Sequence, residues 1–179
     1  IGAQTILDRC GNALTSQSVG PKMLWLRRNH PEVWERTARL HTSTSFIVER
    51  LTGEAVIDHY TAANFSPLYD VGAQDWRFDL AGDIAEERML PRLAWSTEIA
   101  GQVTERAAAA TGLAPGTPVT VGTIDAAAEA VSAGVRSPGE MMTMYGSTIF
   151  IIQITAERVR DGRLWYAPWL FPGEHAAMA

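Results

Sequence analysis

One carboxylate in the chain stands where an enzyme would place a general base. Asp125 follows the β-branched run 119–121, which has the composition of a buried parallel strand, and precedes a small-residue helix predicted over 126–133. Ligands in open α/β sheets bind outside the carboxyl ends of the strands. A carboxylate there can take a proton from a hydroxyl that attacks a phosphoryl group. The alternative is that Asp125 only caps the helix, which from the pattern alone is the commoner role.

A glycine with adjacent hydroxyls forms the second candidate site. Strands are predicted over 141–145 and 148–154, with Gly146-Ser147 as a tight hairpin between them and Thr148 next in the chain. The backbone N–H groups and hydroxyls of such a turn can donate to a phosphate. A plain hairpin turn without a ligand is the alternative reading of this short motif.

Helices and short strands must position these residues. Gly53 and Gly112 are expected to end two helices in the left-handed conformation. Residues 1–20 are predicted to be mostly loop after a short helical end, and the tail from Arg163 contains no clear element. Strands next to helices indicate the α/β class. The predicted helical segments are 22–28, 31–37, 45–51, 58–64, 83–89, 104–111 and 126–133.

Large apolar side chains predict which faces are buried. Phe46, Ile47 and Leu51 are expected to form the buried side of the helix over 45–51. Tryptophan could also stack on a sugar, but core packing is the expected role of three such residues, since large aromatics dominate core burial. These are Trp25, Trp34 and Trp76.

The composition excludes several classes of function. The formal net charge of -5 argues against a nucleic-acid-binding protein, which would show a basic footprint. The chain has no run of about 18 apolar residues, so no membrane-spanning helix is expected. Cys10 is the single cysteine, which rules out an intrachain disulfide and fits a reducing cytoplasm. The four scattered histidines predict no metal site.

Several modest motifs, taken in order, resemble the FGGY family of carbohydrate kinases, with xylulokinase-like members as the nearest subgroup. Their order and spacing are more specific than any one of them. The resemblance covers roughly residues 12–154. Its segments are 20–26, 31–34, 51–54, 58–63, 68–71, Trp76, 90–91, 112–113, 116–119, 122–126 and 145–148.

The resemblance implies a fold and an activity. The fold would be part of an actin- and hexokinase-like (ribonuclease H-like) two-domain sugar kinase of the α/β class. Residues 1–136 would be the later part of its N-terminal, sugar-binding domain, and 137–179 the start of its C-terminal, ATP-binding domain. The activity would be ATP-dependent phosphorylation of a ketose or polyol hydroxyl, with ATP and Mg²⁺ as cofactors and a small sugar as partner. The oligomeric state is left open, with a homodimer as one candidate.

The resemblance also assigns roles to residues. Asp125 would be the general base on the sugar hydroxyl, with Ala126 beside it at the substrate. Gln17 stands where glycerol kinases carry a tyrosine that touches the polyol, which makes it a candidate sugar contact and argues against glycerol. The segment of Gly146, Ser147 and Thr148 would approach the ATP phosphates.

Two of the family's motifs are absent from the sequence: the first phosphate loop, a "DxGT", and the Gly-rich adenosine-binding segment. This chain by itself is therefore expected to be inactive and to expose apolar surface. Two other functions stay open. One is a non-catalytic sugar- or nucleotide-binding module on the same scaffold, since a fold does not fix a function. The other is a structural interaction domain in which Asp125 is only a cap.

Overall fold

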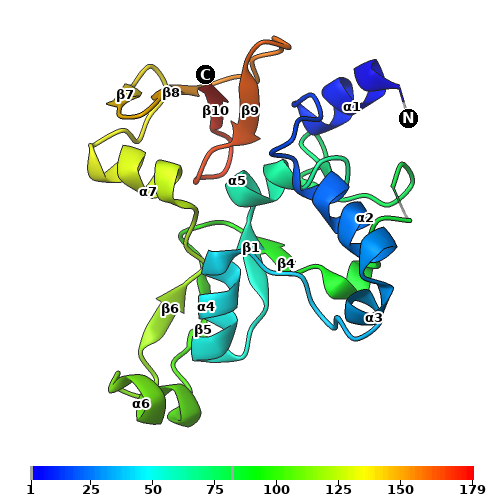
Figure 1. Ribbon diagram of the computed structural model, residues 1–179. Helices are drawn as coiled ribbons and strands as arrows, with labels where there is room; N and C mark the ends of the chain where they lie inside the picture. The colour runs from blue at the N-terminus through cyan, green and yellow to red at the C-terminus, as the bar shows by residue number, and fades with distance from the viewer. Residues whose placement is uncertain (1, 82) are drawn as a thin grey trace.

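The computed structural model describes residues 2–81 and 83–179. The molecule is elongated, with a four-stranded sheet at one end and α6 at the other (Figure 1). The helices are α1 Ala3–Cys10, α2 Val19–Asn29, α3 Pro31–Trp34, α4 Ser43–Thr52, α5 His59–Ala62, α6 Glu105–Thr111 and α7 Asp125–Ser132, with 3₁₀ turns at Ala63–Phe65 and Glu87–Met89. The strands are β1 Val56–Asp58, β2 Tyr69–Asp70, β3 Asp75–Trp76, β4 Arg92–Ala94, β5 Ile99–Gln102, β6 Pro118–Thr120, β7 Met141–Tyr145, β8 Ile149–Thr155, β9 Trp165–Pro168 and β10 His175–Met178.

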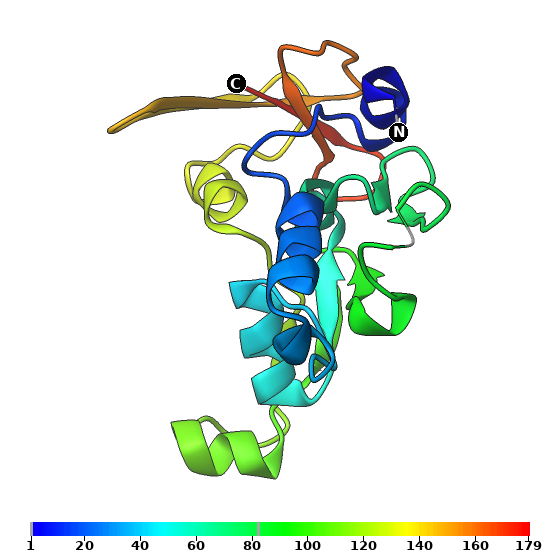
Figure 2. The same cartoon turned by 45° about the vertical axis from the view of Figure 1, so that its right-hand side comes forward.

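The largest sheet has the strand order β7-β8-β10-β9, and all its neighbours are antiparallel. The β7–β8 hairpin projects from the body of the molecule (Figure 2). Three two-stranded ladders make up the rest: β1 with β4 in parallel, β2 with β3, and β5 with β6. The hairpin confirms the two strands predicted around Gly146-Ser147.

Two apolar cores hold these elements together. The larger core lies between the four-stranded sheet, α5, α7 and the segment that follows α5, and it contains the fully buried Leu68, Tyr69 and Trp169. The smaller core lies between α4, β1 and the β5–β6 ladder, where Val48 and Val121 are buried together. Burial of such side chains supplies most of the stabilisation of a domain.

Helix ends follow the sequence closely. Thr42 caps α4, and its hydroxyl accepts from the N–H of Ser45 while the Ser45 hydroxyl accepts from the N–H of Thr42. Thr104 caps α6 in the same position. Gly53 and Gly112 end α4 and α6 at positive φ, which confirms both predicted stops.

The predicted buried side of α4 is wrong for Phe46 and Ile47, whereas Leu51 is half-buried. Phe46 and Ile47 are 49% and 55% exposed, whereas Ser45, Val48 and Thr52 are buried. The buried residues are spaced by three and four, so one narrow face of the helix meets the smaller core and the large side chains lie outside it. Similarly, Trp25 is on the surface rather than in the core, because it points away from the buried Met23 face of α2, whereas Trp34 and Trp76 are partly buried against the larger core.

The strand before Asp125 also differs from the prediction. β6 pairs antiparallel with β5, with Ile99 opposite Thr120, and is not a buried parallel strand. Val121 is buried and Val119 half-buried, whereas Thr120 between them is exposed. The β-branched run therefore turns Val119 and Val121 toward the smaller core and Thr120 toward solvent, the alternation that is usual for an antiparallel strand.

Three segments contain elements other than those predicted. The segment 83–89 forms only a 3₁₀ turn at Glu87–Met89 instead of the predicted helix, and Ile84, Ala85 and Met89 in it are buried. Residues 56–58 form β1, where no strand was predicted. The helix predicted over 58–64 is present as α5 and the 3₁₀ turn Ala63–Phe65, with Asp58 as its cap. The tail from Arg163 forms β9 and β10, of which β10 pairs with β8 and β9 pairs with β10.

Candidate functional site

Residues predicted for the substrate site meet at one cavity. Gln17, Asp125 and Ala126 all line a cavity of about 390 Å³. Its walls come from the loop after α1, from α5, from the start of α7 and from the four-stranded sheet. In both ribbon views α5 and α7 lie on the same side of that sheet (Figures 1 and 2). A concave site of several hundred Å³ is the usual size for a small-molecule ligand.

Asp125 is the first residue of α7, and its side chain is exposed at the cavity. One carboxylate oxygen, Oδ1, accepts a hydrogen bond from the N–H of Ala126 at 2.8 Å. The N-cap position belongs to Ile124, whose side chain makes no capping bond. Asp125 therefore lies one residue beyond the position that capping would require, with its carboxylate held at the start of the helix.

The loop that carries Gln17 is fixed to the edge of the sheet. The side-chain amide of Asn12 donates to the carbonyl of Tyr166 at 2.8 Å and accepts from its N–H at 2.7 Å. These two bonds replace a neighbouring strand along β9, which is an edge of the sheet. Gln17 itself sits in a turn where its N–H donates to the Thr15 hydroxyl. The loop therefore presents Gln17 from a stable position.

Tyr60 of α5 lies in the wall of the cavity between the sheet and Asp125. Its hydroxyl donates to Sδ of Met178 at 2.8 Å, and its ring packs edge-to-face on Trp169 at 5.5 Å between centroids. Burial raises the pKa of the Tyr60 hydroxyl, and the charges of Asp58 and Asp125 raise it further. Tyr60 therefore stays protonated at neutral pH and does not serve as a base.

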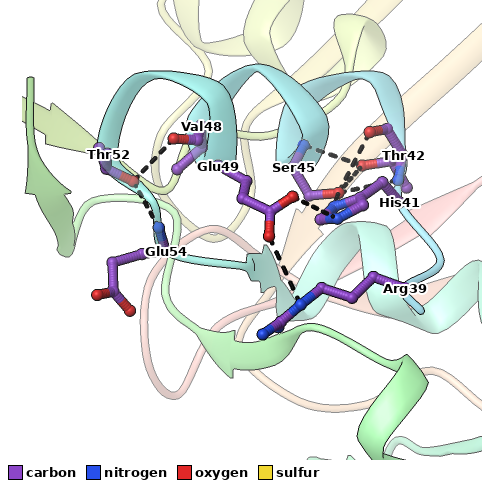
Figure 3. Close-up of polar contacts among 8 residues, drawn as sticks. All are labelled: Arg39, His41, Thr42, Ser45, Val48, Glu49, Thr52 and Glu54. Carbon is purple, nitrogen blue, oxygen red and sulfur yellow. Dashed lines mark hydrogen bonds and ion pairs between the residues drawn. The ribbon is translucent and has the colours of Figure 1, made fainter. Parts of the chain in front are cut away.

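The start of α4 forms another side of the cavity through Thr42. Polar contacts along this helix hold it in place (Figure 3). The ring of His41 lies 3.1 Å from the Ser45 hydroxyl at Nδ1 and 3.0 Å from a Glu49 carboxylate oxygen at Nε2. Glu49 also pairs with Arg39 at 3.5 Å. The N-terminal turn of α4 is thus tied to the segment that precedes it.

A buried carboxylate was missed by sequence reasoning as a site residue. Asp58 ends β1, caps α5 and is only 2% exposed. Its Oδ2 accepts from the N–H of Thr61 at 3.2 Å, from Oγ1 of Thr123 at 2.9 Å and from Oγ of Ser96 at 3.3 Å. Burial raises the pKa of Asp58, and these hydrogen bonds oppose that rise. The signal in the sequence was an apolar run, Ala55-Val56-Ile57, that ends in a carboxylate.

The predicted phosphate segment lies outside the cavity. Gly146, Ser147 and Thr148 are exposed at the tip of the β7–β8 hairpin, where the N–H of Gly146 donates to the carbonyl of Thr148 at 3.0 Å. Phe150, two residues further along β8, does line the cavity. At about 3.3 Å per residue of strand, Thr148 is within roughly 7 Å of Phe150 along the chain. The hairpin tip is therefore near the cavity but not part of its wall.

Comparison with known proteins decides the family. A model of the N-terminal domain of the FGGY family of carbohydrate kinases matches residues 1–132. The chain belongs to the FGGY family of carbohydrate kinases. This confirms the family that the ordered motifs resembled.

Relatives of this FGGY chain are named as kinases. Xylulose kinase of Bacillus subtilis (strain 168) is 29% identical over 87% of the chain and 31% of its own length. Autoinducer-2 kinase of Klebsiella pneumoniae is 31% identical over 73% of the chain and 24% of its own length. The crystal structure of xylulose kinase from Rhodospirillum rubrum is similar over the whole chain and 37% of its own, with 32% identity and a TM-score of 0.94. The chain thus spans about a quarter to a third of the length of these relatives. The predicted α/β fold of the actin- and hexokinase-like sugar kinases is confirmed.

The FGGY chain shows no side-chain metal centre in the residues that the structure describes. Within 2–81 and 83–179, no group of three or more His, Cys, Asp or Glu residues could hold a metal ion. No helix within the same ranges is long and apolar enough to cross a bilayer.

The burial of His59 predicts that the stability of the folded protein depends on pH. It is buried beside Asp58, its Nδ1 lies 2.8 Å from the Tyr69 hydroxyl, and its ring lies 4.5 Å from that of Trp95. Burial lowers the pKa of His59, although the charges of nearby carboxylates raise it. The unfolded chain therefore takes up this proton first, near its ordinary pKa of about 6.5, so stability is full above that pH and declines below it.

We expect the thermal midpoint of the protein to fall between pH 7.5 and pH 5.5, and to fall less in His59→Gln, whose amide can still bond to Tyr69. His30→Gln is the control, because His30 is exposed. Parallel declines in the wild type and in His59→Gln would contradict the expectation.

Proposed function

We propose that the full-length protein containing these residues is an ATP-dependent kinase of a ketose or polyol hydroxyl, with Asp125 as the general base. The observation that carries the proposal is that Asp125 opens a helix at a cavity which Gln17 and Ala126 also line. A base must reach the proton that it removes, and a carboxylate exposed at the cavity meets that need. The names of the relatives, xylulose kinase among them, support a sugar as the acceptor.

The lining of the cavity suits a polyhydroxylated ligand. Amide and hydroxyl side chains alternate with apolar ones around it, as in other sites where a few polar groups orient a ligand. Gln17, Asn64 and Thr42 supply donors and acceptors for sugar hydroxyls, and Phe150 and Trp165 supply apolar walls. The volume of about 390 Å³ lies in the usual range of small-molecule sites.

The proposal includes ATP as the phosphoryl donor and Mg²⁺ as its companion ion. The hydroxyls and N–H groups of the Gly146–Thr148 turn are of the kind that binds phosphate, and they are exposed near the cavity. The residues that the structure describes offer no cluster of metal ligands, so the fit to Mg²⁺ rests on the phosphates of ATP. When bound, Mg²⁺ would neutralise charge on those phosphates. The chain's own residues orient the sugar and accept its proton at Asp125.

ADP release tests the proposal. The full-length protein is mixed with Mg-ATP and, separately, xylulose, ribulose, other ketoses and polyols, and ADP is measured with a coupled assay. We expect sugar-dependent ADP release that is highest with one ketose or polyol. Sugar or nucleotide binding without ADP release on any acceptor would instead indicate a non-catalytic binding module. No binding at all would indicate a structural role. The proposed location is the cytoplasm, where ATP is supplied.

A further inference from the structure

The link between β6 and the candidate base is short and held from two sides. Only residues 121–124 separate β6 from Asp125, and the link consists of Gly122, Thr123 and Ile124 after the buried Val121. The carbonyl of Thr123 accepts from Oγ1 of Thr44 on α4 at 3.0 Å. Its side-chain hydroxyl donates to Oδ2 of Asp58 at 2.9 Å. Backbone and side chain of one residue are thus fixed to two different elements.

Gly122 allows this link to approach α4 closely. Its φ is +71°, which favours glycine, and a Cβ at this position would be 3.2 Å from Cγ2 of Thr44. The link therefore rests directly on the N-terminal turn of α4, the same turn whose Thr42 lines the cavity. Movement of the link would change where α7 begins and where the Asp125 side chain points.

Asp58 is well suited to fix that position. It is the last residue of a strand in the parallel ladder, and its backbone is paired with β4. A carboxylate accepts stronger hydrogen bonds than a neutral group does, and more so where water is excluded. The three donors to its Oδ2 come from α5, from the segment after β4 and from the link to α7. Of these three donors, Thr123 is the one nearest to Asp125 in the chain, with only Ile124 between them.

We propose that Asp58 and Thr123 are positioning residues for Asp125. The Thr123 hydroxyl, bound to the buried carboxylate, sets the start of α7 and so holds the Asp125 carboxylate toward the acceptor hydroxyl. Asp58 and Thr123 are not among the residues that line the cavity, so their proposed role is to act through Asp125. The inference rests on the proposed function, in which Asp125 is the base.

Removing the hydrogen bond between Thr123 and Asp58 should impair turnover more than it impairs sugar binding. A displacement of about 1 Å at a reacting group can cost about 100-fold in rate. We therefore expect Thr123→Val, which keeps the shape but lacks the hydroxyl, to lower kcat by about 10- to 100-fold with KM changed by less than about threefold. Thr123→Ser keeps the hydroxyl and should restore kcat to within about threefold of wild type.

The experiment compares these variants in the full-length protein, with the sugar that gives the highest turnover and with thermal midpoints measured alongside. Ser96→Ala is the matched control, because it removes a different hydrogen bond to the same Asp58 oxygen. It should lower the midpoint and leave kcat within about twofold. Asp58→Asn should lower kcat as much as Thr123→Val does. If Asp58→Asn does not fold, the comparison of Thr123→Val with Thr123→Ser tests the inference by itself.

Two outcomes would overturn the inference: equal kcat values for Thr123→Val and Thr123→Ser, or an equal loss of kcat in Ser96→Ala. Asp125→Asn separates this failure from failure of the proposed function. If Asp125→Asn is inactive while the Thr123 variants do not differ, only the positioning role is wrong. If Asp125→Asn remains active, the proposed base is wrong and the positioning role falls with it.

Discussion

Asp125→Asn should lower kcat of the full-length protein by about 10²- to 10⁴-fold, the range that general-base catalysis contributes. The amide cannot accept the proton that the sugar hydroxyl must lose. Its oxygen can still accept from the N–H of Ala126, as Oδ1 does in the wild type, so the start of α7 should be unchanged. Sugar affinity, measured by calorimetry, should stay within a few-fold of wild type.

The control for that variant is Glu129→Gln. Glu129 lies on the exposed side of the same helix, about one turn from Asp125. Its substitution by glutamine removes a charge of the same sign as that of Asp125. Its kcat should equal that of the wild type. A turnover of Asp125→Asn close to wild type, or an equal loss in Glu129→Gln, would show that the carboxylate at the cavity is not the base.

Trp169→Ala should lower the free energy of unfolding by about 3–5 kcal/mol, the usual cost of removing a large buried aromatic. Trp169 is completely buried in the larger core and packs edge-to-face on Tyr60, which lines the cavity. The change would leave a void that neighbouring side chains fill only in part. The loss should therefore also loosen the wall of the cavity that carries Tyr60.

Trp25→Ala is the matched control for that variant, because Trp25 is 58% exposed. Its effect should be below about 1 kcal/mol, as for other surface substitutions. Urea unfolding followed by circular dichroism measures both. Similar losses in the two variants would mean that burial of the indole does not determine its contribution.

The contrast between Asp58 and Asp125 shows what the sequence could and could not predict. Ordered motifs led to Asp125, and the structure places it at one cavity with Gln17 and Ala126. The physical reason first given for Asp125, a carboxylate that ends a parallel strand and begins a helix, describes Asp58 instead. A three-residue strand carries too little pattern to be distinguished from the start of a helix.

Features that depend on local chemistry were predicted well. The glycines that end α4 and α6 and the hairpin of β7 and β8 follow from a few neighbouring residues. Features that depend on distant partners were not. β10 pairs with β8 on one side and with β9 on the other, and nothing in the Trp-, Pro- and Gly-rich tail indicates β8 as the partner. The exposure of Phe46 and Ile47 likewise depends on which face of α4 the smaller core meets.

A crystal structure of the full-length protein with its sugar bound would test the central claim most directly. The account predicts that the sugar occupies the cavity lined by Gln17 and Ala126. It also predicts that the hydroxyl which becomes phosphorylated lies about 2.6–3.2 Å from a carboxylate oxygen of Asp125, within hydrogen-bond reach. A sugar bound elsewhere, or one whose reacting hydroxyl is beyond the reach of Asp125, would contradict the account.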